Sequence, residues 1–178
     1  MTWRRDLLAN ADRTGLKGAA IGWFLNPGFA VATLYRIMRW GQLRGGAPGR
    51  LVAIVAWRRI VKGYGCYIDP TAAIGPGLRL PHPIGVVIGA GTVIGADVTV
   101  YQHATFGRRT ADEARYPVVG DRATIYAGAT VIGGIAIGEG AIVAAGALVR
   151  RDVPAHGVAL SVPADIRAPS APADIEAR

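Results

Sequence analysis

Two histidines in this chain are candidates for proton transfer. His82 lies in the sequence Leu80-Pro81-His82-Pro83, and His103 follows Tyr101-Gln102. An imidazole has an ordinary pKa of about 6.5, so at neutral pH it can accept the proton of an attacking hydroxyl. We take His82 as the candidate general base; the alternative is a loop histidine that only hydrogen-bonds a carbonyl. His103 could narrow an acceptor pocket, bind the acceptor or simply face water.

The residues around both histidines repeat with a period of six. Apolar side chains occupy every sixth position across residues 68–149, with two interruptions. These positions are Ile68, Ile74, Leu80, Ile88, Ile94, Val100, Phe106, Val119, Ile125, Val131, Ile137, Val143 and Val149. The period fits neither a helix nor a two-faced strand, but it is typical of short strands joined by tight turns. The sequence therefore predicts a mainly β fold, a parallel β-helix with one inward aliphatic side chain per repeat.

The two interruptions are expected to form loops that carry function. Two additional residues follow Leu80, and seven lie within residues 108–117. Solenoids push insertions outward, because the stacked coils already supply the stability. With three repeats per turn, Leu80, Val100, Ile125 and Val143 should stack along one edge, which would bring His82 and His103 to one cleft. His156 lies beyond the last repeat and is expected at the surface.

Positive charge is concentrated in the first third of the chain. Residues 1–62 hold 11 Lys or Arg against Asp6 and Asp12, a net +9, whereas residues 63–178 carry a net −1. No recognition helix, aromatic RNA motif or zinc spacing accompanies this charge, so nucleic acid is not an expected partner. The single cysteine, Cys66, excludes an internal disulfide framework. Residues 1–16 lack a signal-peptide pattern, which favours the cytoplasm.

Residues 1–62 are expected to form a helical cap on the coil. Residues 18–35 are uncharged, but Asn26-Pro27-Gly28 predicts a turn rather than a membrane span. Helices are predicted over 29–44 and 50–62, separated by the glycine-rich stretch 45–49. The apolar side chains of these helices are Val31, Leu34, Tyr35, Met38 and Leu43 in the first, and Leu51, Ile54, Val55 and Ile60 in the second. The cap either only closes the coil or also touches an anionic membrane surface.

The repeats resemble the hexapeptide-repeat acyltransferases, which form left-handed β-helices. The shared motifs are Ile74-Gly75-Pro76-Gly77, Val93-Ile94-Gly95-Ala96, Asp152-Val153-Pro154 and Val162-Pro163-Ala164. Three further stretches are similar to the core of serine acetyltransferase: Gly85-Val86-Val87-Ile88-Gly89, Val100-Tyr101-Gln102 and Thr105-Phe106-Gly107. Asn26-Pro27-Gly28-Phe29 and Tyr35-Arg36 resemble the end of the helical domain of that family. The resemblance spans about residues 25–167. With the charge distribution and the extent of the repeats, it predicts three regions: a basic helical cap (1–62), a left-handed β-helix acyltransferase domain (63–167) and a flexible tail (168–178).

The resemblance makes His82 the catalytic histidine, with several departures around it. The acidic residue that precedes this histidine in the family, and helps to hold the amino group of serine, is Pro81 here. The family's histidine-orienting aspartate falls at Tyr67, and Asp69, two residues on, is the candidate substitute. A later Arg-His-Pro motif reads Arg115-Tyr116-Pro117. Together with His103, Arg115 and Tyr116 are the candidate acceptor-binding residues.

The resemblance also implies acetyl-CoA as the acyl donor, without a metal, in a groove between the subunits of a homotrimer. Ala127 and Ala145, 18 residues apart, match the family's small positions along that groove. Arg150 and Arg151 fall where the family often has polar or basic residues, and arginine binds phosphate well. Ser161 and Asp165 replace a glycine and an arginine of the family near the last coil.

These observations predict an O-acetyltransferase that acts on a hydroxyl. A saccharide acceptor is preferred on the sequence, because Pro81 removes a partner for the ammonium group of an amino acid. The alternative acceptor is L-serine, and the alternative of another class is a binding or structural protein that keeps the coil without the chemistry. The expected location is the cytoplasm, with the inner face of the membrane as an option for the basic cap.

Overall fold

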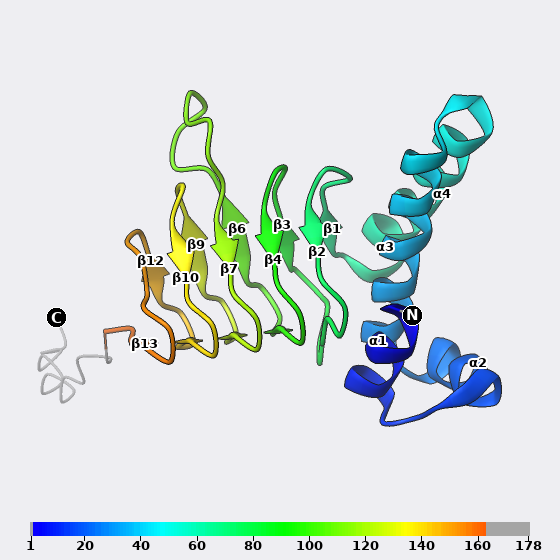
Figure 1. The fold of residues 1–178 in the computed structure, drawn as a ribbon, viewed down its shortest axis with the longest axis horizontal. Helices are drawn as coiled ribbons and strands as arrows, with labels where there is room; N and C mark the ends of the chain where they lie inside the picture. The colour runs from blue at the N-terminus through cyan, green and yellow to red at the C-terminus, as the bar shows by residue number, and fades with distance from the viewer. Residues whose placement is uncertain (1, 163–178) are drawn as a thin grey trace, which may run out of the picture.

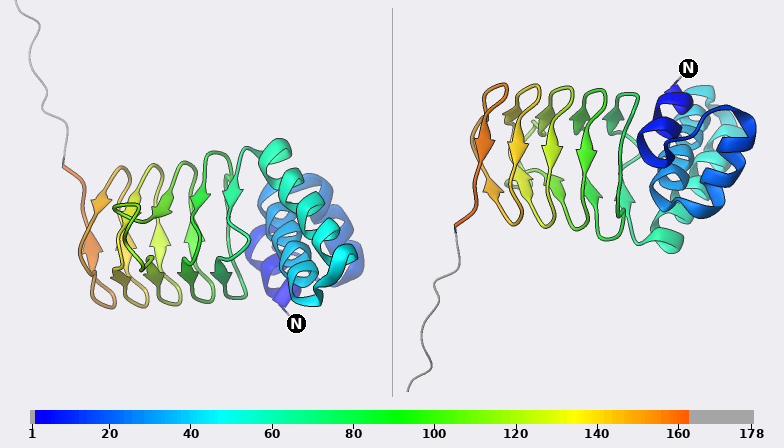
Figure 2. Two further views of the ribbon diagram at one scale, coloured as in Figure 1. Left: turned by 90° about the horizontal axis from the view of Figure 1, so that it is seen from above. Right: turned by 90° about the horizontal axis from the view of Figure 1, so that it is seen from below.

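The computed structural model describes residues 2–162 and shows helices packed on one end of a coil of strands (Figures 1 and 2). The helices are α1 (Thr2–Ala11), α2 (Gly15–Leu25), α3 (Pro27–Arg44) and α4 (Gly46–Tyr64). The coil begins with β1 at Tyr67. The expected tail, 168–178, and the motif residues Pro163, Ala164 and Asp165 lie outside the described residues.

The coil consists of three parallel sheets that form the three sides of each turn. The first sheet holds β1 (Tyr67–Ile68), β3 (Val87–Ile88), β6 (Thr105–Gly107), β9 (Thr130–Ile132) and β12 (Leu148–Val149). The second holds β2 (Ala73–Ile74), β4 (Val93–Ile94), β7 (Val118–Val119) and β10 (Ala136–Ile137), and the third holds β5 (Thr99–Val100), β8 (Thr124–Ile125), β11 (Ile142–Val143) and β13 (Val158–Ala159). Both predicted loops leave this coil, and the longer one projects at the top of Figure 1 between β6 and β7.

The period of six is confirmed by burial, with one correction. All thirteen predicted positions are buried, from Ile68 to Val149. Each repeat also buries a second, mostly smaller side chain two residues before the first, such as Ala72, Ala123 and Ala141. The prediction of one inward side chain per repeat was therefore incomplete. Each repeat directs two side chains into the core, one from the strand and one from the turn that precedes it. The predicted stack of Leu80, Val100, Ile125 and Val143 is confirmed by the parallel pairing of Val100 with Ile125 and of Ile125 with Val143, and by the bridge between Arg79 and Thr99.

The two predicted helices exist, and of the apolar residues predicted to share one face of the first, all but Leu43 are buried. Asn26 caps α3, since its side chain accepts a hydrogen bond from the Phe29 N–H at 2.9 Å. The break between α3 and α4 is confined to Gly45, and α4 starts four residues earlier than predicted because proline is tolerated in a first helical turn. Leu43, five residues after Met38, lies off the helical stripe and is exposed.

Helix α4 buries small residues and exposes large ones. Gly49, Ala53, Ala56 and Ile60 face α3, whereas Leu51, Ile54 and Val55 are exposed. The two helices approach so closely that a Cβ on Gly41 or Gly49 would collide with the backbone of the other helix. Close packing therefore selects the small residues of α4 for the buried face. Among residues 2–162, no helix combines the length and the apolar character that crossing a bilayer requires.

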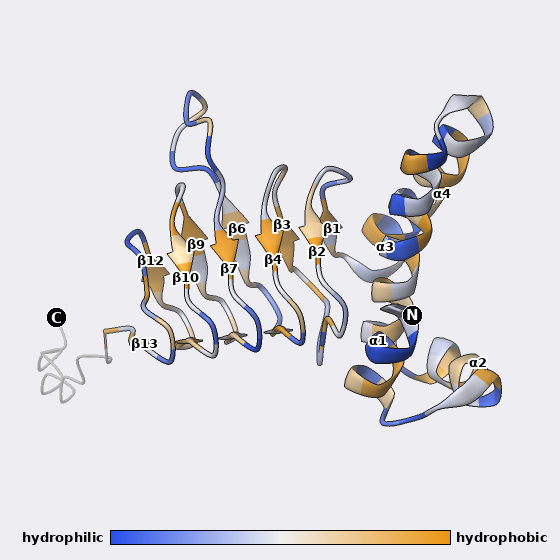
Figure 3. Cartoon of the chain, viewed as in Figure 1, coloured by the Kyte–Doolittle hydropathy of each residue, from blue (hydrophilic) through white to orange (hydrophobic). Residues whose placement is uncertain are grey.

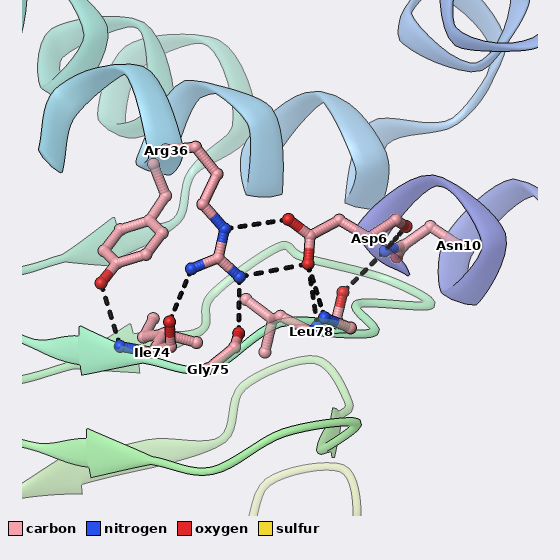
Figure 4. A network of polar contacts seen from close by, with 8 residues as sticks. Asp6, Asn10, Arg36, Ile74, Gly75 and Leu78 are labelled. Carbon is pink, nitrogen blue, oxygen red and sulfur yellow. Dashed lines mark hydrogen bonds and ion pairs between the residues drawn. The ribbon is translucent and has the colours of Figure 1, made fainter. Parts of the chain in front are cut away.

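A buried ion pair joins the cap to the first turn of the coil (Figure 4). Asp6 of α1 is fully buried and pairs with Arg36 of α3, with Arg36 Nε 2.9 Å from Asp6 Oδ2. Asp6 Oδ1 also accepts hydrogen bonds from the N–H groups of Gly77 and Leu78, at 2.8 and 3.2 Å. Arg36 donates to the carbonyls of Ile74 and Gly75, both at 2.6 Å. The pair thus satisfies four backbone groups at the open end of the coil.

Candidate active site

The two histidines lie on one edge of the coil, where the third sheet turns into the first. We call this edge the histidine corner; it comprises residues 81–85, 101–103, 126–128 and 144–146. The turns stack directly, since the His103 N–H donates to the Ile84 carbonyl, the Gly128 N–H to Gln102 and the Gly146 N–H to Ala127, at 3.1, 2.9 and 2.9 Å. The parallel register therefore brings His82 and His103 to neighbouring coils, as the repeat predicted.

The His82 loop is fixed on its N-terminal side by the cap. Asn10 of α1 donates from Nδ2 to the Leu78 carbonyl at 2.7 Å, and its Oδ1 accepts from the Leu80 N–H at 2.9 Å. Gly28 lies so close to the Leu80 carbonyl that a Cβ there would overlap it. His82 itself is exposed, and its ring makes none of the hydrogen bonds among residues 2–162. The imidazole is therefore accessible on a loop whose base is held in place.

His103 packs on the end of the His82 loop. His103 has a φ of +58°, and its ring covers Gly85, where a Cβ would collide with Nδ1. Gly85 is thus needed for its own positive φ and for the close approach of the ring. On the same edge, Tyr101 and Tyr126 stack with ring centroids 5.1 Å apart. Sequence reasoning missed Tyr126, although it follows the apolar position Ile125 just as Tyr101 follows Val100.

Asp69 lies away from the histidine corner, at the end of the strand that Tyr67 begins. Its Oδ1 accepts hydrogen bonds from the Thr71 N–H and Oγ1, at 2.8 and 2.7 Å, and the Tyr67 hydroxyl is 3.4 Å from Oδ2. Tyr67 and Asp69 therefore project from the same side, as their spacing predicted. Within one chain Asp69 makes no hydrogen bond to His82, because its carboxylate closes the turn after β1, so its orienting role stays a prediction.

The other predicted polar residues gather on a second edge, where the first sheet turns into the second. We call it the arginine corner; it comprises residues 69–71, 89–91, 108–117, 133–134 and 150–152. Tyr116 covers Gly91, and the Arg115 side chain lies against Gly134. Glu113 fastens the long loop to the coil by accepting from the N–H groups of Arg109 and Gly134, at 2.8 and 3.0 Å. These backbone donors lower the pKa of Glu113. At neutral pH the carboxylate is therefore ionised and accepts both hydrogen bonds, and these weaken as the pH falls through the lowered pKa.

A hollow lined by three arginines lies on this corner. Arg109 of the long loop joins Arg150, Arg151 and the exposed Leu148 around a space of about 380 Å³. Arginine guanidinium groups converging on an open space suit a phosphate. Arg109 was missed from the sequence, because 41 residues separate it from Arg150 and only the fold brings the loop over the last coil.

The predicted small residues line the histidine corner. Ala127 and Ala145 occupy equivalent positions in successive turns, and Ala145 is exposed. Neither Ala127 nor Ala145 donates its N–H to another backbone group in the part of the chain that the structure describes, whereas the glycines that follow them do. The N–H groups of Gly85, Gly128 and Gly146 are already used in hydrogen bonds between coils, so they are not available to stabilise an oxyanion. The alanine N–H groups remain as candidates.

Comparison with known proteins agrees with this architecture. Residues 116–151 match the family model described as bacterial transferase hexapeptide (six repeats). Serine acetyltransferase 2 of Arabidopsis thaliana is 39% identical over 169 residues, which cover 92% of this chain and 50% of that protein. The serine acetyltransferase of Escherichia coli K12 is 36% identical over 140 residues, which cover 78% of this chain and 50% of that protein. The chain thus spans about half the length of the curated relatives it matches.

Solved structures show the same fold over most of the chain. Soybean serine acetyltransferase complexed with serine superposes with a TM-score of 0.77 at 34% identity, covering 92% of this chain and 67% of that one. Serine acetyltransferase of Brucella abortus in complex with coenzyme A superposes with a TM-score of 0.79 at 28% identity, covering 92% of this chain and 65% of that one. The expected left-handed parallel β-helix with a short helical cap is confirmed by this agreement. Repeat, insertions and structural agreement together place the chain in the hexapeptide-repeat acyltransferase family, among its serine acetyltransferase-like members.

Proposed function

We propose that this chain is an acetyl-CoA-dependent O-acetyltransferase in which His82 is the general base. The observation that carries the proposal is His82 itself: an exposed imidazole, on a loop that interrupts the coil, held at its base by Asn10. The comparisons support the reaction class, since the relatives are serine acetyltransferases and one solved relative is in complex with coenzyme A.

The proposed reaction is a single acyl transfer. The acceptor hydroxyl oxygen attacks the thioester carbonyl carbon while its proton passes to the His82 imidazole. The tetrahedral intermediate then expels the thiolate by breaking the C–S bond, and the imidazolium returns the proton to the departing sulfur. During this step the oxyanion would need donors, for which the N–H groups of Ala127 and Ala145 are candidates in the same corner.

The arrangement of polar residues supports a site that is shared between chains. In one chain His82 and His103 lie on the histidine corner, whereas Arg115, Tyr116 and the three-arginine hollow lie on the arginine corner. One strand of the first sheet separates the two corners in every turn. A homotrimer that brings the histidine corner of one subunit to the arginine corner of the next would complete the site and form a groove for acetyl-CoA.

The trimer is tested by its mass. We expect static light scattering after size-exclusion chromatography to give three times the chain mass of 18.6 kDa. Mixing two inactive variants, His82→Ala and Arg115→Ala, should then restore part of the activity, because some interfaces pair two intact corners. A mass of one chain, or no recovery on mixing, would contradict the shared site.

L-serine is the acceptor that the comparisons support better, although the sequence favoured a saccharide. The relatives are serine acetyltransferases, and the soybean structure is complexed with serine. The departure that favoured a saccharide, Pro81, removes one partner for an ammonium group. Gln102, directly before His103, has a buried Oε1 without a hydrogen-bond partner among the described residues, and an N–H donor of the acceptor would satisfy it. Arg115 remains to pair with a carboxylate.

Acceptor choice is tested by following CoA release with a chromogenic disulfide. L-serine is expected to react with a kcat/KM in the common enzymatic range of about 10⁴ M⁻¹s⁻¹ or above, and homoserine, hexoses and nucleotide sugars more slowly. The only cysteine, Cys66, is buried, and burial raises the pKa of its thiol to about 12, so the protein itself should contribute little signal. Turnover of a nucleotide sugar with inert serine would instead restore the saccharide acceptor.

A further inference from the structure

We propose that the outer face of α4 binds the surface of an anionic lipid bilayer. We define this face as Leu51, Ile54, Val55, Arg58 and Lys62, which recur at helical spacing on the side of α4 opposite to its contact with α3. The three aliphatic residues are 63%, 53% and 53% exposed. The face therefore joins aliphatic side chains in the first half of the helix to cations in the second.

The charge around this face has one sign. Residues 13–68 contain no Asp or Glu. Of the two acidic residues in the cap, Asp6 is buried against Arg36, so only Asp12 is exposed to offset the cations. Because every charged side chain of residues 13–68 is positive, this face attracts an anionic partner over a Debye length and repels a second copy of itself in a two-fold contact.

The face also has a place for a headgroup. Arg58, Arg59 and Lys62 surround a hollow of about 640 Å³ together with Val55 and Tyr64. Three cations beside aliphatic side chains match a lipid, whose phosphate adjoins its acyl chains; they match nucleic acid less well, because exposed Leu51 and Ile54 offer nothing to a phosphate backbone.

The α3–α4 hairpin presents this face without obstruction. The tip of the hairpin projects beyond the coil (Figure 1), and apolar and polar residues alternate along α4 (Figure 3). Two further exposed apolar side chains of α3, Trp40 and Leu43, lie near the tip, and Arg44 stacks on the Trp40 ring at 5.0 Å. Tryptophan and arginine at the end of an amphipathic hairpin are typical of interfacial contacts with lipid.

The test is sedimentation of the full chain with vesicles. Wild-type protein should pellet with vesicles of phosphatidylglycerol and phosphatidylcholine at low salt, and should remain in solution with pure phosphatidylcholine. The double variant Arg58→Gln, Lys62→Gln should bind the anionic vesicles about 25-fold more weakly, at about fivefold for each cation removed. The variant Ile54→Ser, Val55→Ser should bind the anionic vesicles more weakly than wild type at low salt and at high salt, because the apolar contact that it removes does not depend on salt.

A matched control changes the same residue types on the coil. The double variant Arg79→Gln, Val93→Ser alters an exposed arginine and an exposed valine of the coil, outside the face of α4, and it should bind as wild type. Circular dichroism confirms that each variant is folded, and light scattering gives its mass. Equal loss in the control, no binding of wild type to anionic vesicles, or a lower mass for the α4 variants would each overturn the proposal, the last by showing that a second copy covers the face.

Discussion

Replacing His82 by alanine is expected to lower kcat for acetyl transfer by about 10²- to 10⁴-fold, with the KM for acetyl-CoA little changed. The imidazole is exposed on the histidine corner, and its removal takes away the proton acceptor of the reaction without removing a contact to the core. Steady-state kinetics with the best acceptor of the panel measure the effect.

The matched control is His156→Ala. His156 is also exposed and also lies at a turn of the coil, but on the edge between the second and third sheets, beside Gly140. This variant should keep wild-type kinetics. Full activity of the His82 variant would remove His82 from the reaction, and an equal loss in both variants would point to damage to the coil instead.

The second large effect concerns the stability of the cap. Asp6→Ala should lower the free energy that holds α1 on the coil by about 3–5 kcal/mol, the usual cost of breaking a buried ion pair by removing one partner. The change leaves the Arg36 guanidinium without its carboxylate and the N–H groups of Gly77 and Leu78 without their acceptor. Urea denaturation and hydrogen exchange at Gly77 and Leu78 measure the loss.

Asp12→Ala provides the comparison, since Asp12 is the other acidic residue of the cap and is exposed. It should shift the denaturation midpoint little, because surface charges contribute at most about 1 kcal/mol. Unchanged protection of Gly77 and Leu78 in the Asp6 variant would show that the ion pair is dispensable. Since Asn10 holds the Leu78–Leu80 segment from the same helix, the Asp6 variant should also lower kcat.

The coil could be predicted from the sequence because its interactions repeat locally. Each apolar position at a period of six pairs with its equivalent one turn away, so a single register explains burial from Ile68 to Val149. The loops followed from the same register, since residues that do not fit the period must leave the coil. His82 and His103 could be placed on one edge for this reason alone.

The rest depended on contacts between distant segments. The hydrogen bond from the Gly77 N–H to Asp6, 71 residues away, could not be predicted from the sequence. The only indication was that Asp6 is an acidic residue in a mostly basic segment. Arg109 met Arg151 only because the long loop folds back over the last coil. Apolar content also did not indicate which face of α4 is buried, because glycine and alanine line the buried face where the helices pack closely at Gly41 and Gly49.

Because successive turns stack directly on one another, the residues of the histidine corner are evenly spaced along the axis of the coil. Each coil advances along the axis by one strand spacing, about 4.8 Å. The His82 loop, His103, Ala127 and Ala145 lie on four successive coils, so three coil spacings separate the proton acceptor from the last small residue. Ile125 and Val143 are paired one full turn apart, and removing the 18 residues between equivalent positions would preserve every inward side chain. A deletion inside a regular repeat whose length is not a multiple of six would break the register of the inward side chains, whereas length changes within the two loops leave it intact. The reach of a bound molecule along this edge can therefore change between related proteins only in whole coils, with the chemistry at one end left untouched.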